Sequence, residues 1–279
     1  MATADAGPTG ATTRMTKGIP PIFHQIWFDF GRGEGPKVPP RYRDIRRTWR
    51  VCHPRAKHLL WTFPRACAFV KRHFPQVYPH FRKYRQPVHQ TDVFRLLVLA
   101  RMGGIYADMD CRCLAPWDEM LQRPDVRLVV VYHTKMQVHS NWCMASEPHH
   151  PFLQACVRVF EQQPWWHRLC NCKYSTLGTL WLAGPYFVHS LLRKTKTLAD
   201  PTTRSLPHGR PFAQHYGEGT WWLSYSANNI CDVIRALSVI AAVVITAIWL
   251  SSQWRRRHRL GKPTQSTPTS TQPALCASQ

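Results

Sequence analysis

The stretch that decides the fold is residues 90–120, QTDVFRLLVLARMGGIYADMDCRCLAPWDEM. Four apolar side chains of its first half recur at the i, i+3, i+4, i+7 spacing of a buried helical face: Val93, Leu96, Leu97 and Ala100. Thr91 or Asp92 can cap the start of this helix, and Gly103-Gly104 suits its end. Residues 105–108 then predict a short strand. The stretch therefore predicts a buried helix that turns directly into a strand.

Two carboxylates, Asp108 and Asp110, follow at the C-terminal edge of that strand, where open α/β sheets bind their ligands. Residues i and i+2 of an extended segment point to the same side, so both carboxylates are expected to face one cation. Mg²⁺ and Mn²⁺ favour carboxylate oxygens and leave positions open for substrate phosphates. A cation held here can bridge a diphosphate and neutralise its charge as it leaves.

Asp92 and Arg95 are three residues apart and share one face of the predicted helix. One can accept hydrogen bonds from sugar hydroxyls, while the other steadies a phosphate or its partner carboxylate. A DxD pair taken alone is more often a pair of solvated turn residues. Here the strand, the glycine turn and the DxxR helix in front of the pair favour a binding site.

The run TDVFRLLVLARMGGIYADMD resembles the DxD-containing sugar-transfer region of glycosyltransferase family 32. That family includes yeast-type initiating α-1,6-mannosyltransferases and the catalytic subunit of mannosyl-inositol-phosphorylceramide synthase. Upstream, residues 19–27 (IPPIFHQIW) are similar to the family's opening strand, IPxxxHxxW. Downstream, residues 141–152 (NWCMASEPHHPF) resemble its NxxMASxPxHPF stretch, and residues 183–185 (AGP) stand where the family has a TGP turn.

Residues 215–221, HYGEGTW, resemble the family's late HHxxxSW-type element. Tyr216 replaces its second histidine and Thr220 its serine, which leaves open the late metal and acceptor contacts. The resemblance covers residues 17–222 and implies an α/β, Rossmann-like nucleotide-sugar-binding domain of the GT-A type. It also implies a metal-dependent, retaining glycosyltransferase that uses Mn²⁺ or Mg²⁺.

For the metal site, the resemblance makes Asp110 the principal ligand. Asp108 is expected to contact ribose, donor sugar or metal, and His215 or Thr220 to complete the metal shell. No paired general acid and base is evident elsewhere. This fits a mechanism in which the leaving diphosphate helps to deprotonate the acceptor.

For the substrate, the resemblance assigns Asp92 and Arg95 to orienting the sugar and its phosphate, which makes them catalytic together with the DxD pair. Further substrate contacts are expected at four positions: Trp27, Asn141, Gly184 and Trp221. For Trp27 the alternative is a position in the core. His24, in the same predicted strand, is expected to be a hydrogen-bonded core residue.

The elements expected along the rest of the chain alternate between strands and helices. Strands are predicted at residues 22–28, 58–62 and 127–132, and helices at residues 41–50, 64–74 and 151–162. Loops are predicted at residues 31–40, 75–87 and 193–220, and Asn141 is placed in a loop. Residues 176–192 are apolar but interrupted by Gly184-Pro185, so they are assigned to the core.

The charge of the chain implies acidic partners, because 37 Lys and Arg stand against 15 Asp and Glu. Nucleic acid is the natural rival, but neither a Cys/His finger spacing nor an RNP-like motif is present. A nucleotide sugar, an anionic lipid acceptor and a membrane account for the charge equally well. Ten cysteines, among them Cys111-x-Cys113 and Cys170-x-Cys172, indicate disulfides in an oxidising lumen rather than structural zinc.

Four parts are predicted along the chain. Residues 1–16 are a disordered leader without a signal-peptide core, and residues 17–230 are the catalytic domain. Residues 234–254 form a transmembrane helix, of which residues 236–254 are uncharged, and residues 255–279 are a basic, then disordered tail. The cluster RRRHR after the helix places the tail in the cytosol and the catalytic domain in the lumen, whereas the missing signal argues for a cytosolic domain.

The function expected is that of a single-pass enzyme of the Golgi or another endomembrane, with a lumenal catalytic domain. It would transfer mannose from GDP-mannose to inositol-phosphorylceramide in sphingolipid glycosylation, with or without a regulatory subunit. One alternative is an α-mannosyltransferase or other hexosyltransferase acting on protein-linked glycans. The other is a non-catalytic, membrane-anchored scaffold that binds anionic lipid.

Overall fold

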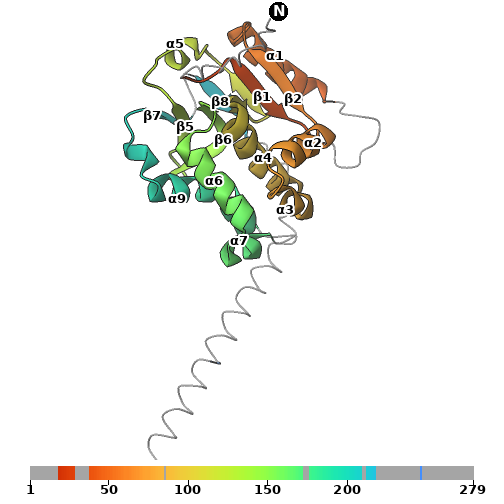
Figure 1. The fold of residues 1–279 in the computed structure, drawn as a ribbon. Helices are drawn as coiled ribbons and strands as arrows, with labels where there is room; N and C mark the ends of the chain where they lie inside the picture. Colours follow the sequence, from red (N-terminus) through yellow and green to blue (C-terminus); the bar gives the residue numbers. More distant parts are fainter. Residues whose placement is uncertain are drawn as a thin grey trace, which may run out of the picture. The chain divides into compact units, whose positions relative to one another are not determined.

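The computed structural model describes residues 18–28, 38–84, 86–171, 176–208, 212–217 and 246. The chain divides into two compact units, residues 1–227 and residues 228–279. Every described residue except Thr246 belongs to the first unit, in which strands and helices alternate in α/β order (Figure 1).

The described helices include none that is both long and apolar enough to cross a bilayer. The helix predicted at residues 234–254 lies outside the described part of the chain, apart from Thr246. The leader, residues 1–16, and the tail, residues 255–279, lie outside it as well.

The central sheet of the described chain has six strands in the order β2-β1-β3-β6-β5-β7. Their bounds are β1 Ile22–Ile26, β2 Lys57–Trp61, β3 Gly104–Ala107, β5 Leu128–His133, β6 Val138–Ser146 and β7 Thr203–Pro207. Strand β1 runs parallel to β2 and β3, and β5 runs parallel to β7. Strand β6 is antiparallel to both of its neighbours and joins the two parallel sets into one mixed sheet.

The register of β6 positions the residues discussed below. Ala107, the last residue of β3, pairs with Cys143 of β6. Because the strands run in opposite directions, residues 138–142 of β6 extend past the end of β3. Asn141 and Trp142 therefore lie beside the DxD turn. A second, two-stranded sheet pairs β4 (Cys111–Cys113) with β8 (Ala213–His215) at the same end.

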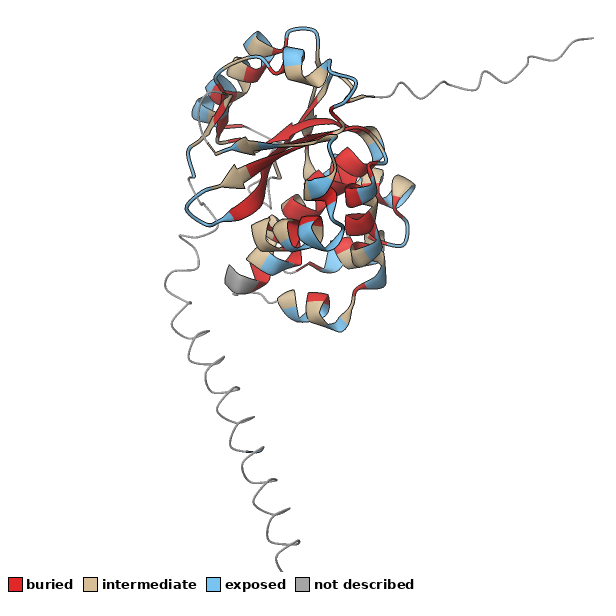
Figure 2. Ribbon diagram, turned by 90° about the vertical axis from the view of Figure 1, so that its left-hand side faces the viewer, coloured by how far each residue is buried: buried red, intermediate tan, exposed pale blue. Residues whose placement is uncertain are grey.

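The helices lie on both faces of the sheet (Figure 2). Their bounds are α1 Pro40–Cys52, α2 Phe63–His73, α3 Tyr78–Lys83, α4 Pro87–Met102, α5 Asp118–Leu121, α6 Pro151–Gln162, α7 Trp165–Cys170, α8 Thr176–Leu182 and α9 Pro185–Lys194, with a 3-10 turn at Thr197–Ala199. Alternation along β3 divides the core: Tyr106 packs among α2, α4, α6 and α9, whereas Ile105 and Ala107 pack with Trp49 of α1 and with Trp117. Each face of the sheet thus has its own hydrophobic cluster.

Helix α4 begins one turn earlier than the sequence predicts. It starts at Pro87 after Gln86, so Thr91 and Asp92 are not its cap. Proline suits a first helical position because its missing N–H has no partner there in any case. The predicted apolar face is confirmed, but every residue from Asp92 to Ala100 is buried, because α2, α3, α6 and the sheet surround the helix.

The glycine turn after α4 is confirmed, and the structure supplies its reason. Gly103 has φ +63°, and a Cβ there would lie 2.7 Å from Pro148 and from the Ser146 carbonyl oxygen. The next residue, Gly104, already belongs to β3, and its Cβ would collide with the Ile22 carbonyl of β1. Glycine therefore lets α4 stop and β3 enter the sheet without a gap.

Most other predicted elements are confirmed within two residues at either end, including the strands now called β1, β2, β3 and β5 and the helices α1, α2 and α6. Three predicted loops are wrong. Helix α3 lies within residues 75–87, Asn141 is in β6, and β7 and β8 lie within residues 193–220. These are short or polar elements whose conformation is set by neighbouring strands and helices, so the local sequence carries little signal for them.

Candidate active site

The DxD pair lies in a tight turn between β3 and β4. The Asp108 N–H donates to the Trp142 carbonyl of β6 at 2.8 Å, and the Cys111 N–H donates back to the Asp108 carbonyl at 3.1 Å. The prediction of an extended segment is therefore wrong at this point, since residues 109–110 form the turn. The turn nevertheless aims both carboxylates at one imidazole.

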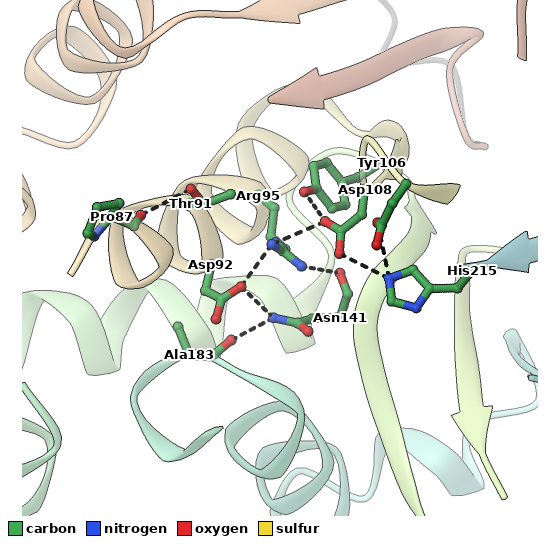
Figure 3. Close-up of polar contacts among 10 residues, drawn as sticks. Pro87, Thr91, Asp92, Arg95, Tyr106, Asp108, Asn141, Ala183 and His215 are labelled. Atoms are coloured by element: carbon green, nitrogen blue, oxygen red, sulfur yellow. Dashed lines mark hydrogen bonds and ion pairs between the residues drawn. The ribbon is translucent and has the colours of Figure 1, made fainter. Parts of the chain in front are cut away.

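That imidazole is His215, the last residue of β8. Strand pairing places His215 opposite Cys111, and the Tyr216 N–H donates to the Asp110 carbonyl at 3.0 Å. The imidazole Nε2 then lies 3.2 Å from Asp110 Oδ1 and 3.7 Å from Asp108 Oδ2. Its ring stacks on Trp142 with centroids 4.9 Å apart. The pairing of β4 with β8 thus places His215, which comes much later in the sequence, beside the DxD turn (Figure 3).

The three side chains suit a hard divalent cation. One ligand atom from each of Asp108, Asp110 and His215 can be chosen so that all lie within 4.8 Å of one another. Two carboxylates and one imidazole are a donor set that Mn²⁺ and Mg²⁺ accept. Burial lowers the pKa of His215, but hydrogen bonds to Asp108 and then Asp110, with their charges, outweigh it and raise the pKa to about 9. A cation would take the place of that proton.

A second polar cluster lies deeper, where α4 faces β6. Arg95 Nη2 pairs with Asp92 Oδ1 at 2.8 Å and with Asp108 Oδ1 at 3.2 Å. Its Nη1 donates to the Asn141 carbonyl at 3.1 Å. Asn141 Nδ2 in turn donates to Asp92 Oδ1 at 3.2 Å and to the Ala183 carbonyl at 3.0 Å. Figure 3 shows these contacts running from α4 to the DxD turn.

Burial dominates the electrostatics of this deeper cluster. It raises the pKa of Asp92 to about 6, against the charge of Arg95, with Asp108 adding to the rise. For Arg95 burial lowers the pKa, but Asp108, Tyr106 and Asp92 together hold it above its usual value, so the guanidinium stays charged. Arg95 Nε is the exception, because it is buried and has no hydrogen-bond partner among the described residues.

Tyr106 links the two clusters and was not singled out from the sequence. Its hydroxyl donates to Asp108 Oδ1 at 2.5 Å, and the Arg95 guanidinium lies 4.8 Å from the centre of its ring. Burial, opposed by the Arg95 charge, raises the pKa of Tyr106 well above its usual value, so the hydroxyl remains a donor. In sequence Tyr106 looks like any aromatic strand residue, and only its position two residues before Asp108 could have drawn attention.

The structure describes only some of the remaining predicted contact residues. Trp27 follows β1, is half-buried and packs against Tyr42 of α1 with ring centroids 5.3 Å apart. Gly184 is buried against the Thr179 carbonyl at the start of α9, next to the Ala183 carbonyl that Asn141 contacts. Thr220 and Trp221 lie outside the described residues. Contact of Trp27, Gly184 or Trp221 with a substrate, and of Thr220 with a metal, stays a prediction.

The predicted core role of His24 is confirmed. Its Nε2 lies 2.9 Å from the Gly103 carbonyl and its Nδ1 accepts from Trp61 Nε1 at 3.1 Å. The prediction of disulfides is not confirmed for six described cysteines, which carry no disulfide: Cys52, Cys67, Cys111, Cys113, Cys143 and Cys156. The predicted Cys111-x-Cys113 pair lies on β4 with both thiols buried.

Residues 39–142 match the family described as the glycosyltransferase sugar-binding region containing a DXD motif. This region of the chain is similar to that family. The resemblance predicted from the sequence is thereby confirmed, and the DXD region spans α1 to the first half of β6.

The curated relatives of this chain include inositol phosphoceramide mannosyltransferases. Inositol phosphoceramide mannosyltransferase 2 of Schizosaccharomyces pombe is 29% identical over 199 residues, which cover 71% of this chain and 51% of the relative. A mannosyl phosphorylinositol ceramide synthase of Saccharomyces cerevisiae is 28% identical over 179 residues, which cover 64% of this chain and 43% of the relative. The chain thus spans about half the length of these two relatives.

The fold of the chain has counterparts among solved structures. The PaToxG glycosyltransferase matches with a TM-score of 0.50 at 16% identity, over 66% of this chain and 72% of that chain. At this identity the similarity concerns the fold alone. The predicted α/β fold of the GT-A type is confirmed by it.

Proposed function

We propose that this chain is a divalent-cation-dependent hexosyltransferase that moves mannose from GDP-mannose to inositol-phosphorylceramide with retention of configuration. The observation that carries the proposal is the convergence of Asp108, Asp110 and His215 from two separate strands at the end of β3. That end of the sheet is where α/β folds bind nucleotides. The family match over residues 39–142 supports sugar transfer.

The metal would be held by Asp108, Asp110 and His215, and when bound it would neutralise the charge of the diphosphate leaving group. The protein's own residues then position the donor. Asp108 Oδ1 is held by Tyr106 and by Arg95, which leaves Oδ2 on the side of His215. A carboxylate fixed in this way meets its ligand without reorganising, which favours the transition state.

Arg95 and Asp92 would contact the donor from the deeper side of the site. Both residues are buried, and Asn141 Nδ2 donates to the Asp92 oxygen that pairs with Arg95. The unpaired Nε of Arg95 is a donor available to a phosphate or sugar oxygen. The Asp92 carboxylate can accept from a sugar hydroxyl.

The acceptor and compartment rest on the relatives and on the charge of the chain. One relative described above is named an inositol phosphoceramide mannosyltransferase and the other a mannosyl phosphorylinositol ceramide synthase. An anionic phosphodiester acceptor suits a chain with a net charge of +22. We extend the proposal to an endomembrane location, with the catalytic domain in the lumen of the Golgi or a neighbouring compartment and with a regulatory subunit left open.

The test is a transfer assay with the full chain in detergent. GDP-mannose, UDP-glucose and UDP-galactose are each offered with inositol-phosphorylceramide, in Mn²⁺, in Mg²⁺ and in chelator. The proposal expects mannose transfer with a divalent ion, loss with chelator, and loss in Asp110→Ala but not in Asp44→Ala, an exposed carboxylate of α1. The anomeric proton of the product, measured by NMR, reports whether configuration is retained.

Three outcomes would overturn parts of the proposal separately. Turnover with a different nucleotide sugar would overturn the donor while leaving the site intact. Turnover unaffected by both chelator and Asp110→Ala would overturn the metal site. Transfer to an oligosaccharide acceptor with none to the lipid would replace the acceptor by a protein-linked glycan.

A further inference from the structure

Helix α7 presents two large apolar side chains to solvent. Trp165 is 69% exposed and Leu169 is 65% exposed, and their i, i+4 spacing places them on one side of the helix. Exposed apolar side chains that gather on one face of a domain mark a site of interaction with a protein or a membrane. These two residues, together with Lys83 and Arg168, are called the α7 face below.

The side of α7 opposite this face is anchored in the fold. His167 is fully buried, and its Nε2 lies 2.9 Å from the Leu182 carbonyl at the end of α8. Its Nδ1 lies 3.3 Å from Gln163 Oε1, and Gln163 also donates to the Tyr84 hydroxyl. Trp165 and Leu169 are therefore held outward by a fixed helix.

The apolar residues are accompanied by positive charge. Arg168 lies between them on α7 and is exposed. Asn171, at the end of α7, donates to the carbonyl of Lys83 at 3.4 Å, which brings the exposed end of α3 alongside. Neither residues 45–91 nor residues 162–199 contain an Asp or Glu. The α7 face thus combines tryptophan, leucine and cations, with no carboxylate from the segments that form it.

We propose that the α7 face rests on an anionic lipid bilayer. Tryptophan favours the interface between headgroups and acyl chains, and lysine and arginine next to it attract anionic headgroups. A protein partner could also bury tryptophan, but the lack of carboxylates in these segments complements a surface of uniform negative charge. The inference requires a membrane surface but not the transfer reaction, so it can fail independently of the proposed function.

The position of the face gives it a consequence for the site. His167 contacts the Leu182 carbonyl, and the next residue, Ala183, accepts from Asn141, which contacts Asp92. A bilayer bound at α7 would therefore be linked to the donor-binding cluster through Leu182, Ala183 and Asn141. An acceptor whose lipid tail stays in the bilayer could reach the site without leaving the membrane.

The test measures the depth of one labelled position at a time in the full chain. A fluorescent amino acid, dansylalanine, is incorporated by amber suppression at residue 165, which avoids the native cysteines. The protein is reconstituted into vesicles of phosphatidylcholine with or without 30 mol% phosphatidylinositol, and quenching by brominated phosphatidylcholine in both leaflets is recorded, on the scale of the roughly 5–10 Å depth of interfacial helices. The matched control carries the label at Val51 of α1, which is 71% exposed and also lies next to an arginine, Arg50.

The α7 face predicts strong quenching at residue 165 in anionic vesicles and little at residue 51. In the Lys83→Gln/Arg168→Gln variant, each lost charge should weaken the docked state roughly fivefold. Equal quenching at both positions, or none at residue 165, would overturn the proposal. Unchanged thermal unfolding of the labelled and charge variants shows that any loss of quenching is not a loss of fold.

Discussion

The two polar clusters of the site differ in how their charges are balanced. In the deeper cluster, on α4 and β6, Arg95 pairs with Asp92 Oδ1, and Asn141 Nδ2 donates to the same oxygen. In the outer cluster, at the end of β3, two carboxylates face a single imidazole. The deeper cluster is buried, whereas the side chains of Asp108 and His215 remain 23% and 21% exposed.

This difference indicates that the deeper cluster supports the site, whereas the outer cluster is suited to bind a cation. A buried ion pair that has its partners is rigid and is costly to break. Two carboxylates against one histidine retain net negative charge, which a divalent cation can compensate. Arg95 joins the two clusters, because its Nη2 contacts both Asp92 and Asp108. The following predictions test this division, from the largest expected effect to the smallest.

Replacing Arg95 with methionine should damage both clusters. It leaves Asp92 buried without its cation, which costs about 3–5 kcal/mol of unfolding free energy. The measurement is urea unfolding followed by tryptophan fluorescence at pH 7. Arg95→Lys keeps the charge and serves as the control, with a smaller loss expected. A change below about 1 kcal/mol in Arg95→Met would mean that Arg95 does not hold the deeper cluster together.

Replacing Asp110 with asparagine should damage function without damaging the fold. We expect sugar transfer to fall about 10²–10³-fold, the range found when one group that stabilises transition-state charge is removed. Unfolding should change little, since the Asp110 side chain is not part of the deeper cluster. Asp44→Asn is the matched control. Equal losses of activity in the two variants would remove Asp110 from the reaction.

Adding Mn²⁺ should stabilise the wild-type protein through the outer cluster alone. At a concentration one hundred times its dissociation constant, a ligand of the native state contributes about 2.7 kcal/mol, which is a shift of a few degrees in Tm. Differential scanning fluorimetry with Mn²⁺ and with chelator measures the shift. His215→Ala should abolish most of it and Arg101→Ala, on the exposed side of α4, should not. A full shift in His215→Ala would contradict the assignment of this ligand.

The pKa of Asp92 predicts a pH dependence of stability. Burial, opposed by Arg95, raises its pKa in the folded protein to about 6, above the usual 3.8. The stabilisation that Asp92 contributes to the folded protein is therefore fully present below pH 3.8 and is lost as pH rises through 6. Its size is on the order of 1–3 kcal/mol. Urea unfolding at a series of pH values, compared with Asp92→Asn, isolates it, and identical pH profiles of the two proteins would contradict the prediction.

Replacing Thr91 with alanine should have the smallest effect. The sequence suggests Thr91 as a helix cap, and losing a cap costs about 1 kcal/mol. In the structure its hydroxyl only donates to the Pro87 carbonyl within α4, so we expect a change within about 0.5 kcal/mol. Urea unfolding distinguishes the two positions for the start of α4. Gly103→Ala is the positive control, because its φ of +63° disfavours any side chain.

Much of the fold was accessible from local patterns. The α4 face, the Gly103-Gly104 turn and strand β3 follow from apolar spacing and from the backbone freedom of glycine. The DxD and DxxR pairs could be recognised in this stretch because the two residues of each pair are only two or three positions apart in the sequence. Elements without a strong local pattern were missed, above all α3 and β8.

The sequence by itself therefore determined which stretch carries the chemistry, since hydrophobic period and glycine placement act over a few residues. Only the tertiary structure decided how the site is assembled. The pairing of β4 with β8 brings His215 to Asp110, and the register of β6 brings Asn141 to Arg95. Such contacts join residues far apart in the chain, and their register is set by packing across the whole sheet, which no local pattern encodes.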